Sequence, residues 1–258
     1  MAVLGSALAA LLVLPTLALV VTATPGDIVA GFRHPVAMPA LLLSLGTTAL
    51  SLVIVLVLGT PLAWWLSTAK GRGAHALETL VALPVVIPPA VAGIALLLTF
   101  GRRGLLGPAL AVTGLSVSFS TAAVVLAQVF VSAPFYLQAA TAAFRELDRS
   151  FLVVARSLGA APARVFFLVA LPLAKGGLVG GAAMAWARAL GEFGATLMFA
   201  GNLTGRTQTL PLAIYTALES DLRAAQALSL LLVVVAFGLL LVLRGRQRWR
   251  SVRGEGER

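Results

Sequence analysis

Six long apolar stretches, separated by short polar segments, are the feature that most restricts what this chain can fold into. They cover approximately residues 3–22, 41–66, 79–100, 118–140, 168–200 and 226–243. Most of them reach the ~20 residues that an α-helix needs to cross the hydrocarbon of a bilayer. The chain is 60% hydrophobic, above the roughly 45–50% of ordinary soluble domains. The sequence therefore predicts an all-α integral membrane protein with about six transmembrane helices, forming a single transmembrane domain over residues 1–258.

The basic residues indicate how these helices are oriented. With a cytoplasmic N-terminus, 13 of the 19 Lys and Arg residues fall inside or at the inner interface, namely Lys70, Arg72, Arg145, Arg149, Arg156, Arg164, Lys175, Arg244, Arg246, Arg248, Arg250, Arg253 and Arg258. This positive-inside bias predicts that both termini are cytoplasmic. We interpret the basic tail 244–258 as an orientation signal that also meets the anionic lipid of the bilayer. The net charge of +10 therefore does not call for a nucleic-acid partner.

Residues 1–22 raise the question of a cleaved signal peptide. They lack a basic N-terminal segment, and a second span follows soon after, so a retained first helix is favoured over a signal peptide. Partial processing of this segment stays open. The chain has no cysteine, which excludes disulfides, thiolate metal sites and cysteine nucleophiles.

The third apolar stretch carries three prolines within six residues, Pro84, Pro88 and Pro89. Proline frees backbone hydrogen-bonding groups inside a helix. At membrane depth such backbone is tolerated only where it is buried in protein or lines a wet cavity. Pro88 and Pro89 are therefore candidates for a gate or pathway, with a simple kink near the helix start as the alternative.

The fifth stretch holds two charged residues, Arg188 and Glu192. They are four residues apart, which places them on one helical face where they can pair. Charges at this depth usually face the bundle interior and mark a pathway or a structural pair, and structural pairing is favoured here. With Thr196 they complete the pathway candidates. Earlier in the stretch, Gly176, Gly177, Gly180 and Gly181 form small-xxx-small pairs that predict tight helix packing, plausibly between two copies of the chain.

Two outer segments carry groups suited to an anion or to its carrier protein. Arg102 and Arg103 oppose the positive-inside trend, and they would raise the local anion concentration at an external mouth. Cations that complement a helix C-terminus are the alternative explanation. Arg206, Thr207 and Gln208 supply a charge and hydrogen-bond donors in a later outer loop, for which simple solvation is equally compatible.

The segment between the fourth and fifth stretches is short, basic and helix-prone. This segment resembles the cytoplasmic "EAA" loop of ATP-binding-cassette importer permeases, because Ala155, Gly159 and the ending Val169-x-Leu171-Pro172 match most of its spacing. Val153 and Val154 replace the leading Glu-Ala of that family. The resemblance implies a coupling loop over about residues 145–167 that docks on a separate ATPase. The residues it assigns to this loop are Ala155, Arg156, Ser157, Gly159, Ala160, Pro162 and Arg164. The chain lacks the Gly-x-x-x-x-Gly-Lys-Ser/Thr phosphate-binding motif.

Three further segments sharpen this resemblance over roughly residues 41–243. They are Arg188-Ala-Leu-Gly-Glu-Phe-Gly-Ala-Thr196, Gly205-Arg-Thr-Gln-Thr-Leu-Pro-Leu-Ala-Ile-Tyr215 and Phe100-Gly-Arg-Arg-Gly104, and together they are similar to the permease subunits of molybdate importers, with sulfate and thiosulfate permeases as related alternatives. The resemblance implies an ABC importer permease fold, a homodimer in a bacterial or archaeal cell membrane, and an extracytoplasmic oxyanion-binding protein.

The same resemblance implies that molybdate or tungstate is the cargo and that this chain performs no catalysis. It would bind no cofactor itself, because ATP and Mg would sit on the partner ATPase. An ion-coupled secondary transporter is less favoured, since the sequence shows no convincing inverted repeat.

Overall fold

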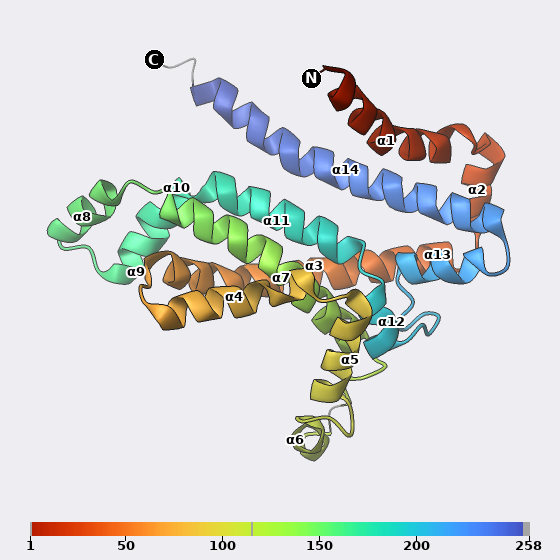
Figure 1. Ribbon diagram of the computed structural model, residues 1–258, viewed down its shortest axis with the longest axis horizontal. Coiled ribbons are helices and arrows are strands. Elements are labelled where there is room, and N and C mark those ends of the chain that lie inside the picture. The colour runs from red at the N-terminus through yellow and green to blue at the C-terminus, as the bar shows by residue number, and fades with distance from the viewer. Residues whose placement is uncertain (1, 115, 255–258) are drawn as a thin grey trace. The chain divides into compact units, whose positions relative to one another are not determined.

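A computed structural model describes residues 2–114 and 116–254, and every regular element within those ranges is a helix. The predicted all-α class is confirmed. The elements follow one another in the order shown in Figure 1: α1 (Ala2–Val21), α2 (Pro25–Arg33), α3 (Ala37–Thr68), α4 (Arg72–Val86), α5 (Pro89–Phe100), α6 (Gly107–Val112), α7 (Thr121–Arg145), α8 (Arg149–Ser157), α9 (Pro162–Val165), the π-helical turn η1 (Phe166–Ala170), α10 (Leu171–Leu173), α11 (Lys175–Leu190), α12 (Gly194–Ala200), α13 (Leu210–Leu218) and α14 (Leu222–Gly254). The side chains of the predicted basic tail 244–258 lie outside the described residues.

Helix length and composition identify the candidate membrane spans among the described residues. Helices α3 and α7 are each long and apolar enough to cross a membrane. Two bent pairs qualify when each is counted as one span: α4 with α5, bent by 117°, and Pro162–Leu173 with Lys175–Leu190, bent by 74°. Gly5–Val21 and Leu222–Gly238 are shorter apolar helices. These helices overlap the six apolar stretches. The bounds and number of the spans, and the side on which each terminus lies, stay predictions.

The chain divides into two compact units. One comprises Met1–Ser44 and Asn202–Gly238, and the other comprises Leu45–Gly201 and Leu239–Arg258. We call them the small unit and the large unit. Helices α3 and α14 each contribute to both. That the whole chain acts as one transmembrane domain stays a prediction.

The large unit is built on α7, which packs closely against α11. A Cβ added to Gly181 would lie 2.8 Å from Ala139 Cβ, and one added to Gly177 would collide with Ala143. Small residues thus bring the two helix backbones together, which is how helices associate where lipid offers no hydrophobic driving force. The tight packing predicted for the glycines is confirmed for this pair within the chain.

Buried polar side chains join α7 to α3 in the same unit. Gln128 is 1% exposed; its amide donates to Thr47 Oγ1 at 3.1 Å and accepts from Ser51 Oγ at 2.9 Å. About two helical turns further along α7, Tyr136 shares a hydrogen bond of 2.6 Å with Thr60 on α3, between the two hydroxyls. Gln128 therefore joins α7 to α3 by hydrogen bonds, whereas Gln138 is exposed.

The small unit is held together by short contacts between segments distant in sequence. The backbone N–H of Leu210, at the start of α13, donates to Ser44 Oγ on α3 at 2.7 Å. A Cβ added to Gly31 on α2 would lie 2.6 Å from Ala227 Cβ on α14. The cluster of buried residues contains Ala37, Ala40, Leu210, Ala213, Ala217, Ala225, Leu228 and Leu231.

The apolar stretch 168–200 is not one continuous helix, which corrects the sequence-based boundary. A π-helical turn precedes α10, and within it the N–H of Leu171 donates to the carbonyl of Phe166, five residues back. Pro172 follows directly and has no N–H to continue a regular ladder. After α11 the chain breaks again at Gly191, Glu192 and Phe193 before α12 begins.

Candidate functional site: a coupling loop and a broken helix pair

The predicted coupling loop forms a helix-turn-helix with a glycine at its corner. Asp148 caps the first helix, α8, by accepting a hydrogen bond from the Ser150 N–H at 2.9 Å. Gly159 then adopts φ +82°, and a Cβ added there would meet nothing within 4 Å. The second helix, α9, opens with Pro162, a residue suited to a first helical turn. The turn at Gly159 therefore requires left-handed backbone conformation and leaves open space around it.

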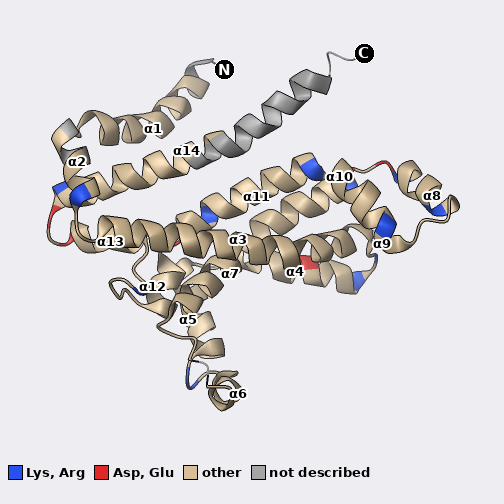
Figure 2. Cartoon of the chain, turned by 180° about the vertical axis from the view of Figure 1, so that it is seen from behind, with Lys and Arg blue, Asp and Glu red and all other residues tan. Residues whose placement is uncertain are grey.

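The outer surface of this loop combines apolar and basic side chains. Arg156 and Arg164 are exposed, as are Ser157 and Pro162, while Ala155 and Ala160 are half-buried. Large apolar residues lie among them, with Val153 63% and Leu158 82% exposed. Figure 2 shows that basic residues of the large unit gather at the end that carries α8 and α9. Such a mixed surface suits a protein partner better than water alone.

The proline-rich segment breaks the third apolar stretch between α4 and α5. Pro84 is accommodated inside α4, which ends at Val86, and Pro89 opens α5. Ile87 and Pro88 between them are extended, with ψ angles of 129° and 140°. The interruption predicted from the prolines is present, and it turns the chain by 117°.

The start of α5 packs against α12, the short helix after the second break. A Cβ added to Gly194 would lie 2.7 Å from Pro89 Cβ, and one added to Gly93 would lie 2.6 Å from Met198 Cβ and 2.8 Å from the Ala195 carbonyl. The two helices thus touch backbone to backbone through glycines. Pro88 and Pro89 are brought next to the 192–198 region, which sequence spacing alone does not indicate.

Arg188 and Glu192 form the predicted ion pair, with 2.7 Å between Arg188 Nη1 and Glu192 Oε2. Glu192 does not lie on the same helix, because α11 ends at Leu190. Its other oxygen, Oε1, accepts a hydrogen bond from the Ala195 N–H at 2.7 Å. Thr196, the third pathway candidate, is fully buried, and its hydroxyl has no hydrogen-bond partner among the described residues.

Arg102 and Arg103 lie in the turn that follows α5, and both are exposed. Arg102 Nε donates to Ser116 Oγ at 3.5 Å, a long contact. The pair follows the C-terminal end of α5, where cations complement the helix dipole. Their placement suits both explanations that the sequence left open.

The small unit contains Arg206, Thr207 and Gln208, which differ in how far they are buried. Arg206 is exposed, whereas Thr207 is 0% and Gln208 4% exposed. Thr207 Oγ1 accepts from the Leu203 N–H at 2.9 Å, and Gln208 Nε2 contacts Thr216 Oγ1 at 3.4 Å. Thr207 and Gln208 therefore fold the loop on itself and do not present their donors at the surface of the unit.

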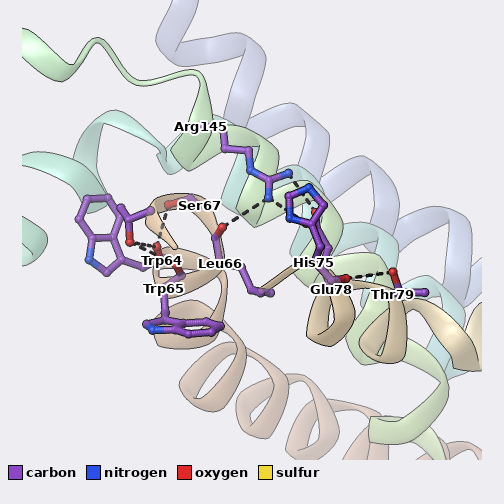
Figure 3. A network of polar contacts seen from close by, with 9 residues as sticks. Trp64, Trp65, Leu66, Ser67, His75, Glu78, Thr79 and Arg145 are labelled. Atoms are coloured by element: carbon purple, nitrogen blue, oxygen red, sulfur yellow. Dashed lines mark hydrogen bonds and ion pairs between the residues drawn. The ribbon is translucent and has the colours of Figure 1, made fainter. Parts of the chain in front are cut away.

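The large unit contains one polar cluster that the sequence does not predict. Arg145, the last residue of α7, makes a bidentate ion pair with Glu78 on α4, with both N–O distances 2.9 Å. Its Nη2 also donates to the Leu66 carbonyl on α3 at 3.3 Å. Figure 3 shows the guanidinium pointing between these two groups. Because the partners are 67 and 79 positions away, no spacing rule finds them.

Comparison with known proteins gives consistent matches. Residues 56–250 match the family model described as "Binding-protein-dependent transport system inner membrane component". The chain is 50% identical over 212 residues to the molybdenum transport system permease protein ModB of Mycobacterium tuberculosis, covering 82% of this chain and 80% of that protein. It is 37% identical to ModB of Escherichia coli K12, covering 79% and 90%.

Solved structures of low sequence identity share the fold. A chain from the crystal structure of a bacterial alginate ABC transporter, in complex with an alginate pentasaccharide-bound periplasmic protein, superimposes with a TM-score of 0.71 at 20% identity, covering 95% of this chain and 92% of that one. A chain of the inward-facing MetNI methionine ABC transporter gives a TM-score of 0.64 at 20% identity, covering 84% and 96%.

Proposed function

Because this chain belongs to the family of binding-protein-dependent transport system inner membrane components, we propose that it is the transmembrane subunit of an ATP-driven importer of molybdate or tungstate in the cell membrane. The observation that carries the cargo assignment is the 50% identity to a permease named for molybdenum transport, spread over four fifths of both chains. The role of this subunit is to form the path, and the reaction that drives it takes place on another protein.

The coupling loop supplies the contact for that other protein. A helix that is exposed on apolar and basic positions, anchored by a cap at Asp148 and turned at Gly159, offers a firm projection to a partner's cleft. Movement in the partner is passed on only through a rigid element. We assign the partner as a separate ATP-binding subunit that holds ATP and Mg and that grips residues 155–164.

The path for the anion lies by the two broken helices in this proposal. Extended backbone at Ile87 and Pro88 is compatible with membrane depth where it is enclosed by protein or lines a cavity. The Arg188–Glu192 pair beside it is internally neutralised. A neutral lining lets a dianion pass without holding it tightly, which a transport path requires.

Two further partners complete the assembly. An extracytoplasmic binding protein delivers the anion in this proposal, and the family description, which names a binding-protein-dependent transport system, supports such a partner. A second copy of this chain supplies the other half of the path. Support comes from α11, where Gly177 and Gly181 face α7 while a Cβ at Gly176 or Gly180 would meet nothing within 4 Å. That open pair leaves room for a second helix to approach closely.

The test is uptake of labelled molybdate into vesicles that contain this chain, its ATPase and its binding protein. We expect uptake to require ATP and to be competed by tungstate but not by sulfate. Competition by sulfate would move the system to the sulfate and thiosulfate group. Uptake that continues without ATP would overturn the importer assignment.

A further inference from the structure

Three helix segments of the large unit meet at the Arg145 side chain. Arg145 is the last residue of α7, Glu78 lies in α4, and Leu66 lies near the end of α3. The guanidinium reaches both Glu78 oxygens at 2.9 Å and the Leu66 carbonyl at 3.3 Å. Two parallel N–H···O bonds to one carboxylate fix orientation as well as distance. The contact therefore holds the middle of α4 and the end of α7 in one relative position.

The Leu66 carbonyl belongs to the last turn of α3, where carbonyls lack partners within the helix. Its neighbours are satisfied locally, since Trp64 accepts from Ser67 Oγ at 2.7 Å and Trp65 accepts from the Ala69 N–H at 2.8 Å. Leu66 is reached by Arg145 from 79 positions away. A cation at this point also complements the negative end of the α3 dipole.

This cluster lies at the start of the predicted coupling loop. Only Glu146, Leu147 and Asp148 separate Arg145 from α8, which begins at Arg149. Glu146 donates its N–H to the Ala142 carbonyl, and Asp148 caps α8. Leu147 packs on the buried cluster of the large unit. Because these contacts hold the three-residue link, we expect a displacement of α8 to move the end of α7 as well.

On its other side, the cluster is connected to the broken helix pair. Glu78 lies eight residues before Val86, so about 12 Å of helix separates it from the break at Ile87 and Pro88. Beyond the break, α5 packs on α12 through Gly93 and Gly194. Helix α4, with Pro84 inside it, thus connects the Arg145 contact to the break that holds Pro88 and Pro89.

From this arrangement we propose that Arg145 and Glu78 are positioning residues that transmit the motion of the coupling loop to the α4–α5 break. The proposal rests on the transporter function proposed above. Both side chains are about half exposed, at 45% and 40%. An ion pair of this exposure adds little to folding stability. Its loss therefore acts on coupling between hydrolysis and transport more than on folding.

The experiment measures molybdate imported per ATP hydrolysed by the complete complex in vesicles. We expect Arg145→Ala and Glu78→Ala each to lower this ratio by roughly fivefold or more, the usual scale of a coupling between two sites. Assembly with the ATPase and the rate of ATP hydrolysis should persist. The double variant should be no worse than either single variant, because both remove the same contact. Arg145→Lys should restore the ratio in part, since an ammonium keeps the charge but loses the two-pronged geometry.

The matched control is Arg72→Ala, which removes an exposed arginine from the same helix, α4. It should import molybdate at the wild-type ratio. An unchanged ratio in Arg145→Ala would overturn the proposal, and so would a parallel loss of uptake and hydrolysis, which marks a merely structural role.

A second readout does not depend on the cargo. The chain has no cysteine, so spin labels at Leu80→Cys on α4 and Arg149→Cys on α8 report their distance without background from other positions of this chain. With Arg145 present, we expect this distance to stay narrow and unchanged between the nucleotide-free and ATP-bound complex; with Arg145→Ala it should broaden. Equal distributions of the label-to-label distance with Arg145 and with Arg145→Ala would contradict the positioning role. A wild-type complex that imports no molybdate yet shows the label result would refute the proposed function alone.

Discussion

Glu192 lies between α11 and α12, where one of its carboxylate oxygens pairs with Arg188 and the other accepts a hydrogen bond from the Ala195 backbone. Oε2 lies 2.7 Å from Arg188 Nη1, and Oε1 accepts from the Ala195 N–H at 2.7 Å. The carboxylate is 1% exposed, while the arginine keeps 29%. The break between α11 and α12 is thus organised around one buried charge, and the two partners are not equivalent.

Removing Arg188 should cost more than neutralising Glu192. Arg188→Ala leaves a buried carboxylate without its counter-charge, and we expect the free energy of unfolding to fall by about 3 kcal/mol. Glu192→Gln keeps an amide oxygen for the Ala195 N–H and should cost about 1–2 kcal/mol. Unfolding in mixed micelles measures both. The double variant Arg188→Ala/Glu192→Gln should lose less than the two single losses combined. Equal losses for Arg188→Ala and Glu192→Gln would contradict this asymmetry.

The glycine contact between α5 and α12 makes a second prediction. A Cβ at Gly93 would lie 2.8 Å from the Ala195 carbonyl, a backbone atom that cannot rotate away. Gly93→Ala must therefore push the two helices apart, at a cost of about 1–3 kcal/mol for overpacking. We expect lower thermal stability and lower uptake. Gly46→Ala on α3 is the control, since its added Cβ would meet nothing within 4 Å, and helix propensity predicts a gain of about 0.5–1 kcal/mol. Similar behaviour of both variants would show that the contact tolerates separation.

The sequence carries those features that depend on near neighbours. Apolar length predicts the helical class, the prolines at 84, 88 and 89 predict the α4–α5 break, and the Gly159 corner follows from a local motif. The four-residue spacing of Arg188 and Glu192 predicts their pair even though the helix ends between them. Local chemistry of this kind is decided within one or two turns.

What the sequence does not reveal depends on distant partners. Helix α12 meets α5 because Gly194 fits against Pro89 and Gly93 fits against Ala195. The partners in each contact are some hundred positions apart, so the sequence does not indicate them. Thr207 and Gln208 look like surface donors in a polar loop, yet they are buried where the loop folds on Leu203 and Thr216. Arg145 and Glu78 each look like ordinary loop charges until the helices that carry them are placed. The periodicity of apolar residues indicates which face of a helix is buried, but it does not indicate which segment of the chain covers that face.

The turn at Gly159 predicts a graded response to substitution. Its φ of +82° lies in the left-handed region, and its surroundings are open, so only backbone strain opposes a side chain. Asn tolerates this region better than Ala, and a β-branched residue tolerates it least. We therefore expect uptake to fall in the order Gly159, Gly159→Asn, Gly159→Ala, Gly159→Val, with unchanged insertion in the membrane.

For that series the control is Gly73→Ala on α4, where an added Cβ would meet nothing within 4 Å and φ is not positive. It should transport like the wild type. Gly159→Val with full uptake would show that the corner does not need this conformation.

The cap at Asp148 predicts how helix α8, the first helix of the proposed coupling loop, responds to acid. The hydrogen bond from the Ser150 backbone holds the pKa of this carboxyl below its ordinary value of 3.8. A carboxyl whose pKa is lower in the folded state stabilises that state above its unfolded pKa, and the contribution is lost as pH falls through the folded value. The start of α8 should therefore be insensitive to pH from neutrality down to about 3.8 and should loosen only below it.

A nitroxide at Val153→Cys, an exposed position on α8, reports this loosening as increased label mobility. Asp148→Asn is the matched variant, because its amide oxygen still caps the helix but has no proton to gain. Its mobility should stay constant over the range in which the wild type changes, while Asp148→Ala should be mobile at every pH. If Asp148→Asn loosens at the same pH as the wild type, the transition belongs to another group, and the capping carboxylate does not set the lowest pH at which α8 stays ordered.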